Sequence, residues 1–186
     1  MRKWPRFIYK TRGLLMAPPL VFVVLSTWGE VENHWLIFGG GGTVFLLGLL
    51  LRIWSQMHLR YRLKAKKTLM QTGPYQVIRN PIYIGNMLLM AGVCVLAELL
   101  WFAPIMLLYA AGVYSLAVRH EEARLRQKYP ADYEVYCREV PRWLPRPRVF
   151  HFRRTRAVGA MTVLSLRAEI HNLLFLLPIA IKEIYR

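Results

Sequence analysis

The sequence predicts an all-α integral membrane protein with about four transmembrane helices, including a helical hairpin in its C-terminal half, plus short cytosolic helices and an amphipathic C-terminal helix. Of the 186 residues, 55% are hydrophobic and gather in long uncharged runs, yet the formal net charge is +16. A soluble domain of this size could not bury so much apolar surface, so the basic residues are expected outside a membrane. No small-residue cleavage site follows the basic arm 1–12, so the first apolar run is expected to be kept as a helix.

Residues 1–34 are predicted to form an N-terminal arm and the first membrane helix. The apolar run Leu14–Trp28 is shorter than the roughly 20 residues that cross a bilayer. It is expected to recruit Phe7–Tyr9 or to span where the bilayer thins. Pro18 and Pro19 should bend this helix, which a membrane helix tolerates when neighbouring groups bond the freed carbonyls.

Residues 35–148 are predicted to form the functional core, which begins with a second helix, Trp35–Trp54. Tryptophan at both ends of this helix is typical of anchoring at the membrane–water interface. The run Gly39–Gly42 could serve as a hinge or let another helix approach closely. The basic stretch Gln56–Gln71 is interpreted as a solvated face against anionic headgroups, and no nucleic-acid reader motif accompanies it.

A helical hairpin is predicted over Ile82–Val118. This run holds 37 residues, too many for one crossing, and a single charge, Glu98. The charge marks a tight turn between two helices, and Trp101 and Pro104 begin the second of them.

The distribution of basic residues predicts the topology. None of the 26 Lys and Arg residues falls in the loop with Glu30 and Glu32 or in the loop at Glu98. By the positive-inside rule these loops face away from the cytosol, which gives four spans with both termini cytosolic. The expected location is a bacterial cytoplasmic membrane.

The segment Arg119–Arg148 is predicted to carry the fourth helix out of the membrane. That helix is expected to end before Pro130, and a second short helix, Ala131–Cys137, to end before Pro141.

Residues 149–186 are predicted to be a basic linker and an amphipathic helix. Seven apolar residues of Val163–Arg186 share one helical stripe: Val163, Leu166, Ile170, Leu173, Leu177, Ile181 and Ile184. Because Pro178 interrupts the segment, we interpret it as lying at the interface or docking on the bundle rather than as a fifth span.

Two polar clusters, Gly73–Gly85 and Arg119–Arg142, flank the hairpin. Because a hairpin returns to the face it left, these clusters are expected to meet on the cytosolic side and to form one site. In the first cluster, Gly73 and Pro74 predict a turn and Pro81 the first position of a helix. Asn80 is then the N-cap of that helix or a ligand contact.

Charged residues of both clusters are candidate ligand contacts. Arg79 could reach lipid phosphates or clamp an anionic group. Glu121 and Glu122 are adjacent on a helix and point about 100° apart, which favours one carboxylate facing a cationic ligand over an acid/base pair. His120 has no second His or Cys at ligand spacing, so no metal site is predicted.

The run GPYQVIRNPIYIGN, a hydrophobic hairpin and the run EEARLRQKYPADYEVYCREVPRWLP follow one another in this order. This order resembles the membrane methyltransferases of the isoprenylcysteine carboxyl methyltransferase and phospholipid methyltransferase group, over about Trp35–Pro145. The resemblance implies transfer from S-adenosylmethionine, with the cofactor at the cytosolic mouth of the bundle. A lipophilic substrate would enter sideways from the bilayer.

The resemblance also implies roles for individual residues. Ten would bind the cofactor: Gly73, Tyr75, Asn80, Pro81, Tyr83, Gly85, Glu121, Glu122, Tyr133 and Tyr136. Among these we expect Glu122, with Glu121 as its substitute, to hold S-adenosylmethionine, and Arg79 or Arg142 to orient an anionic substrate group. The distal motif of the group falls on Val140, Pro141, Arg142 and Trp143. Asn80 stands where the group usually has histidine, and since asparagine cannot titrate near neutrality, it is expected to position the cofactor and not to act as a base.

The methyl acceptor stays open between a prenylcysteine-like carboxylate, a phospholipid amine, and a small thiol or other lipid. Two other functions also stay open: a sterol-reductase-like membrane oxidoreductase that uses NADPH, and a non-enzymatic membrane scaffold. Membrane lipids are expected partners, and the oligomeric state is open.

Overall fold

The computed structural model describes residues 3–29, 33, 35–65, 68–145 and 162–184, and within these ranges it contains helices and turns but no β-strand. The longer helices are α1 (Lys3–Leu25), α2 (Gly42–Ala65), α3 (Pro81–Leu96), α4 (Phe102–Lys128) and α5 (Pro130–Glu139). The shorter elements are η1 (Trp35–Gly41), η2 (Gly73–Gln76), α6 (Thr162–Glu169), η4 (Ile170–Phe175) and α7 (Leu176–Ile184). The predicted all-α class is confirmed.

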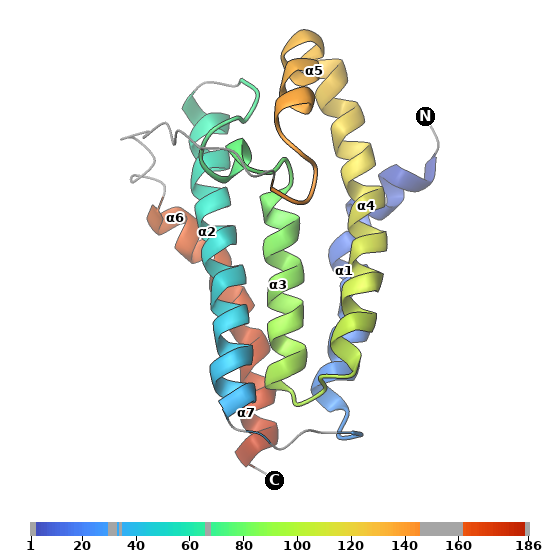
Figure 1. The fold of residues 1–186 in the computed structure, drawn as a ribbon, viewed down its shortest axis with the longest axis vertical. Helices are drawn as coiled ribbons and strands as arrows, with labels where there is room; N and C mark the ends of the chain where they lie inside the picture. The colour runs from blue at the N-terminus through green and yellow to red at the C-terminus, as the bar shows by residue number, and fades with distance from the viewer. Residues whose placement is uncertain (1–2, 30–32, 34, 66–67, 146–161, 185–186) are drawn as a thin grey trace.

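The helices form an elongated bundle in which α3 lies between α2 and α4 (Figure 1). α2 packs along α3, α1 along α4, and α6 along α2. α5 lies at one end of the bundle, the site end, and the turn between α3 and α4 lies at the other, the loop end (Figure 1). The hairpin therefore returns the chain to the end that it left.

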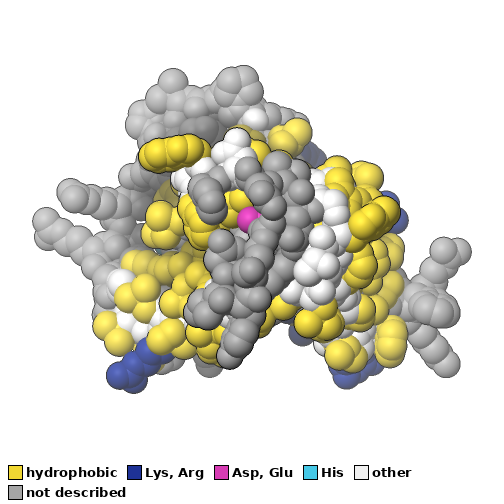
Figure 2. All heavy atoms as spheres, turned by 90° about the horizontal axis from the view of Figure 1, so that it is seen from below, with side chains coloured by type: hydrophobic (Ala, Val, Ile, Leu, Met, Phe, Trp, Pro, Cys, Tyr) yellow, Lys and Arg dark blue, Asp and Glu magenta, His cyan; other side chains and the backbone are white. Residues whose placement is uncertain are grey.

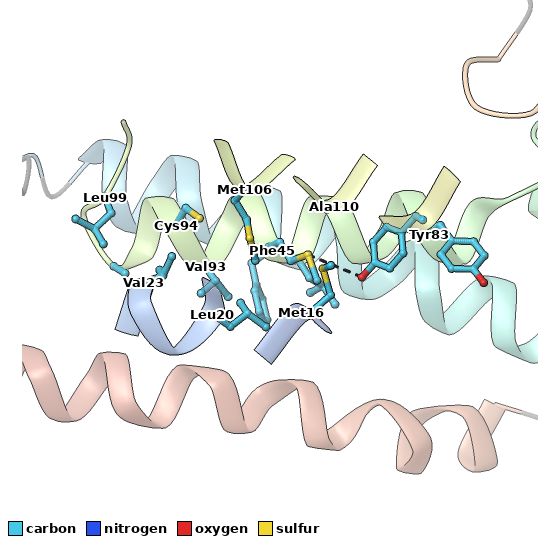
Figure 3. Packing of buried hydrophobic residues seen from close by; sticks show 14 of the residues in the cluster. Met16, Leu20, Val23, Phe45, Tyr83, Val93, Cys94, Leu99, Met106 and Ala110 are labelled. Atoms are coloured by element: carbon cyan, nitrogen blue, oxygen red, sulfur yellow. Dashed lines mark hydrogen bonds between the residues drawn. The ribbon is translucent and has the colours of Figure 1, made fainter. Parts of the chain in front are cut away.

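The core is a row of apolar side chains contributed by four helices. It runs from Leu99 at the loop end to Tyr83 near the site end, with Val93 and Met106 between them (Figure 3). Many outward-facing residues are apolar too, and Leu47, Leu50 and Leu108 are each more than half exposed. An apolar core inside an apolar exterior is what a bundle surrounded by lipid requires.

Close packing of α2 on α3 depends on glycine. A Cβ added to Gly48 would lie 2.7 Å from the backbone nitrogen of Leu89, so a larger residue there would push the two helices apart. In the run Gly39–Gly42, only a Cβ added to Gly41 would lie so close to another helix, 2.9 Å from Cγ1 of Val95. Gly39, Gly40 and Gly41 lie in the π-helix η1 that leads into α2.

The predicted hairpin is confirmed. α3 and α4 are joined by a tight turn at Glu98, which has a positive φ of 65°. α3 has 16 residues, which correspond to about 24 Å of helix, less than the ~30 Å hydrocarbon layer. The second predicted helix differs at its end: α2 continues past Trp54 to Ala65, so the basic stretch begins on a helix.

Four stretches are long and apolar enough to cross a membrane, and they differ in part from the four spans that the sequence predicts. They are Arg6–Leu25, Trp35–Arg60, Phe102–Lys128 and Thr162–Ile181, whereas Pro81–Leu96 is a shorter apolar helix. The last stretch belongs to the C-terminal segment, which the sequence analysis did not count as a span.

The C-terminal segment runs along the bundle and ends at the loop end, whereas α1 begins toward the site end (Figure 1). The prediction that both termini are cytosolic stays a prediction. Polar residues of the segment, Ser165, Glu169 and Asn172, are buried, while much of its apolar stripe is exposed. The helix thus presents its polar face to the bundle and its apolar face outward.

The described side chains at the loop end carry little charge. Viewed from that end, they are mostly hydrophobic, an acidic side chain is visible near the centre, and Lys and Arg appear only at the margins (Figure 2). The predicted acidic loop residues Glu30 and Glu32, and the predicted basic linker over 149–161, lie outside the described residues. The boundaries of the predicted core, 35–148, stay a prediction.

Candidate functional site

The two polar clusters meet at the site end. Arg79 N donates to the carbonyl of Pro141 at 2.9 Å, and Tyr136 OH donates to the carbonyl of Tyr75 at 2.7 Å. Since α5 follows α4 directly, these bonds hold the short helix over the turn that precedes α3. The hairpin geometry predicted this meeting.

A cavity of about 940 Å³ lies where the clusters meet, and α1, α2, α3, α4 and α5 all contribute residues to it. Its size falls within the range of small-molecule sites. Nine of the predicted site residues line it: Tyr75, Arg79, Asn80, Pro81, Tyr83, Glu121, Glu122, Tyr133 and Tyr136. Gly73, Gly85 and Arg142 are not among its lining residues.

Glu122 is the centre of a buried charge cluster. Its side chain is 3% exposed and contacts two guanidinium groups. Arg79 Nη1 lies 3.4 Å from Oε1, and Arg142 donates from Nε to Oε1 at 3.0 Å and from Nη2 to Oε2. Hydrogen bonding to Glu122 and the negative charge of Glu122 raise the pKa of Arg142. Glu122 therefore connects α4 to the loop before α3 and to the segment that follows α5.

Glu121 points to a different part of the cavity. Its Oε2 accepts a hydrogen bond from Tyr83 OH at 3.1 Å, and no arginine contacts it in the ion pairs of the described residues. The two adjacent carboxylates thus take separate roles, as the 100° rotation between them implies.

Three tyrosines form the apolar wall of the cavity. Tyr75, Tyr133 and Tyr136 are all buried, and Tyr133 and Tyr136 pack with Leu69 in a second small core. Burial is the main cause that raises the pKa of each of these tyrosines. They are neutral near pH 7, so they offer ring faces and hydroxyl groups without adding negative charge.

Two predicted site glycines have structural roles. Gly73 has a φ of +62°, and a Cβ there would lie 2.4 Å from His58 Nε2, so this turn needs glycine. A Cβ on Gly85 would lie 2.5 Å from Arg52 Cγ, so glycine lets that side chain cross α3. Both glycines thus fix the backbone around the cavity without lining it.

Asn80 occupies the predicted N-cap position of α3, and Pro81 follows it at the first helical position. Its side chain does not cap the helix, contrary to one of the two roles that the sequence left open. Instead Asn80 Nδ2 donates to the carbonyl of Arg142 at 3.3 Å. The amide therefore joins the loop before α3 to the chain after α5.

Several residues that line the cavity were not predicted from the sequence. Arg12 of α1 also lines the cavity, and its guanidinium lies 4.3 Å from the ring centroid of Tyr9. Arg52 and Tyr114 line it as well, although both lie in stretches apolar enough to span a membrane. An ionisable residue within such a stretch is itself a signal for function, and that signal was available for Arg52.

Fold and cavity together define a polytopic helical membrane protein with a charged, ligand-sized cavity at one end of its bundle. The family model of the phospholipid methyltransferases matches residues 34–132, more than half of the chain. The chain belongs to the phospholipid methyltransferase family. The resemblance drawn from its motifs is confirmed.

Two curated bacterial relatives are similar to this chain. The nickel-cobalt-cadmium resistance protein NccN of Alcaligenes xylosoxydans xylosoxydans is 29% identical over 120 residues, 62% of this chain and 55% of the relative. The cobalt-zinc-cadmium resistance protein CzcN of Cupriavidus metallidurans is 30% identical over 108 residues, 56% of this chain and 49% of the relative. The chain thus spans about half the length of these relatives. No solved structure matches it.

The names of these relatives concern metal resistance. Within the described ranges, no group of three or more His, Cys, Asp and Glu side chains is arranged to hold a metal ion.

Proposed function

We propose that this membrane methyltransferase uses S-adenosylmethionine and methylates a lipophilic acceptor at the cytosolic face of the membrane. The acceptor would be an isoprenylcysteine-like carboxylate or a phospholipid amine that enters from the bilayer. The observation that carries the proposal is the cavity of about 940 Å³, in which a carboxylate, basic side chains and tyrosine rings converge.

The side chains of the cavity fit the cofactor. S-adenosylmethionine carries a sulfonium, an ammonium and a carboxylate, besides a flat adenine ring. A carboxylate suits its cationic groups, a guanidinium suits its carboxylate, and aromatic faces suit the sulfonium and the adenine. Glu121, Arg12 and Tyr133 line the cavity and offer one group of each kind.

Glu121 is the better candidate for contact with the cationic part of the cofactor. Glu122 is 3% exposed and already balances two arginines, so a cation beside it would compete with both. Glu121 is less buried, and its hydrogen-bond partner is the neutral hydroxyl of Tyr83. We therefore assign the cofactor contact to Glu121 and the support of the surrounding loops to Glu122.

Methyl transfer is an in-line displacement, and the bound cofactor supplies an activated methyl group. A carboxylate acceptor needs no base, because it is already an anion. In that case the task of the protein is to align the two molecules and to exclude water. Asn80 at the position of the usual histidine agrees with this task, because asparagine can position a group but cannot take up a proton near neutrality.

Calorimetry on purified protein tests the proposal. The parent is expected to bind S-adenosylmethionine, and Glu121→Gln to bind it about 10- to 100-fold more weakly, the loss expected for one hydrogen bond to a charged group. Arg126→Gln, which changes an exposed residue outside the cavity, serves as the control. Binding of NADPH in place of S-adenosylmethionine would support a reductase and refute the proposal.

Transfer itself is measured with methyl-labelled S-adenosylmethionine and native membranes, separated afterwards into lipid, protein and small-molecule fractions. Label is expected in the lipid fraction or in lipid-modified protein. A parent that neither binds the cofactor nor labels any fraction would exclude a methyltransferase.

A further inference from the structure

An ion pair inside the bundle joins the C-terminal segment to α2. Arg52 donates from Nε to Glu169 Oε2 at 2.6 Å and from Nη2 to Oε1 at 3.1 Å. The Glu169 side chain is 2% exposed, and Asn172 Nδ2 donates to its Oε2 at 2.6 Å. Glu169 and Asn172 lie beyond the region 34–132 that the family model matches.

The backbone makes room for this arginine. Gly85 lies beside the Arg52 side chain, and a Cβ there would come within 2.5 Å of its Cγ. A Cβ added to Gly48, one turn before Arg52, would likewise lie 2.7 Å from the backbone nitrogen of Leu89 in α3. The lack of a Cβ at these glycines thus leaves room for the long Arg52 side chain at the contact between α2 and α3.

Arg52 also lines the cavity, together with Gln56, Asn86 and Tyr114. Tyr114 precedes Glu122 by eight residues on α4, so this part of the cavity lies about 12 Å deeper in the bundle along that helix. The cavity thus extends from the proposed cofactor contacts into the apolar stretch of the helices, and polar side chains line this inner part. An ionisable group at such a depth is a functional candidate by default.

We propose that Arg52 recognises the anionic group of the lipophilic acceptor, while Glu169 and Asn172 hold its guanidinium in place. This inference rests on the proposed function and selects the carboxylate acceptor, in which the anionic group is also the methyl-accepting group. Glu169 is a positioning residue, because it acts on the acceptor through Arg52.

Arg52 is available for this role in a way that Arg79 and Arg142 are not. Those two arginines both contact Glu122. The pair with Glu169 uses Nε and Nη2 of Arg52, and no hydrogen bond among the described residues uses Nη1. A planar guanidinium can hold one carboxylate on one edge and offer its remaining donors to a second.

The charge of the cavity favours the same kind of acceptor. Six basic residues line it, Lys10, Arg12, Arg52, Arg79, Arg124 and Lys128, against the two acidic residues Glu121 and Glu122. A protonated amine would meet net repulsion there, whereas a carboxylate would be attracted.

Two probes that differ by one methyl group, which removes the negative charge, test the inference: N-acetyl-S-farnesylcysteine and its methyl ester. Equilibrium binding of each is measured on purified full-length protein in lipid nanodiscs. The parent is expected to bind the carboxylate at least about tenfold more tightly than the ester, and Arg52→Gln to lose that preference. Labelled methyl transfer to the carboxylate should show a raised KM in the same variant.

Glu169→Gln separates recognition from structure, because it breaks the ion pair but keeps the guanidinium. This variant is expected to show a smaller preference for the carboxylate than the parent but a larger one than Arg52→Gln, because the guanidinium stays but is no longer held in place, whereas the control Arg126→Gln is expected to keep the full preference. The double variant Arg52→Gln with Glu169→Gln leaves no buried charge unpaired and should also lose the preference.

The inference is overturned if the parent binds both probes equally or does not bind the carboxylate. It is also overturned if Arg52→Gln and Glu169→Gln weaken the binding of both probes by the same factor. The same holds if Arg12→Gln alone removes the preference for the carboxylate. Calorimetry on the same preparations keeps the two proposals apart. A parent that does not bind S-adenosylmethionine refutes the proposed function, whereas one that binds it without any carboxylate preference refutes only the role of Arg52.

Discussion

Replacing Glu122 by glutamine would remove the charge on which the loops of the site converge. The side chain keeps nearly the same shape, so packing changes little. Two arginines would lose their counter-charge: Arg79, whose side chain is 13% exposed, and Arg142, whose side chain is 35% exposed. Glu122→Gln is therefore a test of charge alone.

The expected loss of stability follows from how buried each arginine is. Breaking a buried ion pair by removing one partner costs about 3–5 kcal/mol when the remaining charge is fully buried. Only Arg79 approaches that case, whereas water screens much of the charge on Arg142. We therefore expect a loss of about 3 kcal/mol, at the lower end of this range. For a chain of this length that is a fall in Tm of roughly 6–12 °C by the scaling for soluble domains.

Thermal unfolding in nanodiscs measures the effect. The matched control is Glu134→Gln, which breaks the pair of Glu134 with Arg126, where both side chains are half exposed. That change is expected to lower stability by less than about 1 kcal/mol. If Glu122→Gln unfolds at the same temperature as Glu134→Gln, the claim that Glu122 supports the site is wrong. If Glu122→Gln does not bind S-adenosylmethionine at temperatures where it stays folded, Glu122 and not Glu121 contacts the cofactor.

Three further predictions concern stability, each measured by thermal unfolding under the same conditions. Gly48→Ala should cost about 1–3 kcal/mol because the new Cβ meets the backbone of α3, whereas Gly39→Ala, with nothing within 4 Å, should not destabilise the protein; equal effects would refute the close contact. Tyr136→Phe should cost about 1–3 kcal/mol because it leaves a carbonyl of the turn η2 without its donor, and an unchanged Tm would contradict this. In a cycle of Arg52→Met and Glu169→Met, each single variant should be less stable than the double variant, because each leaves one charge unpaired; additive losses would show that the ion pair is not coupled.

The hairpin and the meeting of its two flanks could be predicted from the sequence. A run of 37 residues with one charge leaves few alternatives to two helices and a turn at Glu98. Once the hairpin is set, its flanks must lie at one end of the bundle, and the contact of Tyr83 with Glu121 follows from that topology.

Side-chain partners at the site could not be predicted in the same way. Arg79, Glu122 and Arg142 each had a proposed ligand role, yet the structure directs both arginines to one carboxylate. That outcome depends on the path of the chain after α5, where Arg79 N bonds the carbonyl of Pro141. Helical periodicity carries no information about such a path.

The C-terminal segment shows a second limit of periodicity. Its apolar stripe was visible in the sequence, but a stripe can face a core or face lipid with the same spacing. Burial decides between them: Ile170 is 64% exposed, whereas Glu169 next to it is 2% exposed. The signal that could have decided the question was Arg52, a charge within an apolar stretch that needs an acidic partner.

The two ion clusters lie at different depths along the bundle and tie different segments to it. At the site end, Glu122 binds the chain that follows α5, and deeper inside, Arg52 binds the segment that contains Glu169. The family model matches residues 34–132, which include Arg52 and Glu122 but neither Arg142 nor Glu169. One partner of each cluster therefore comes from outside the matched region. Since a buried charge persists only where a counter-charge meets it, the walls of the cavity depend on that outside region. A change in the C-terminal segment is therefore expected to alter the inner end of the cavity, where we propose that the acceptor binds, while the proposed cofactor contacts on α4 and α5 stay in place.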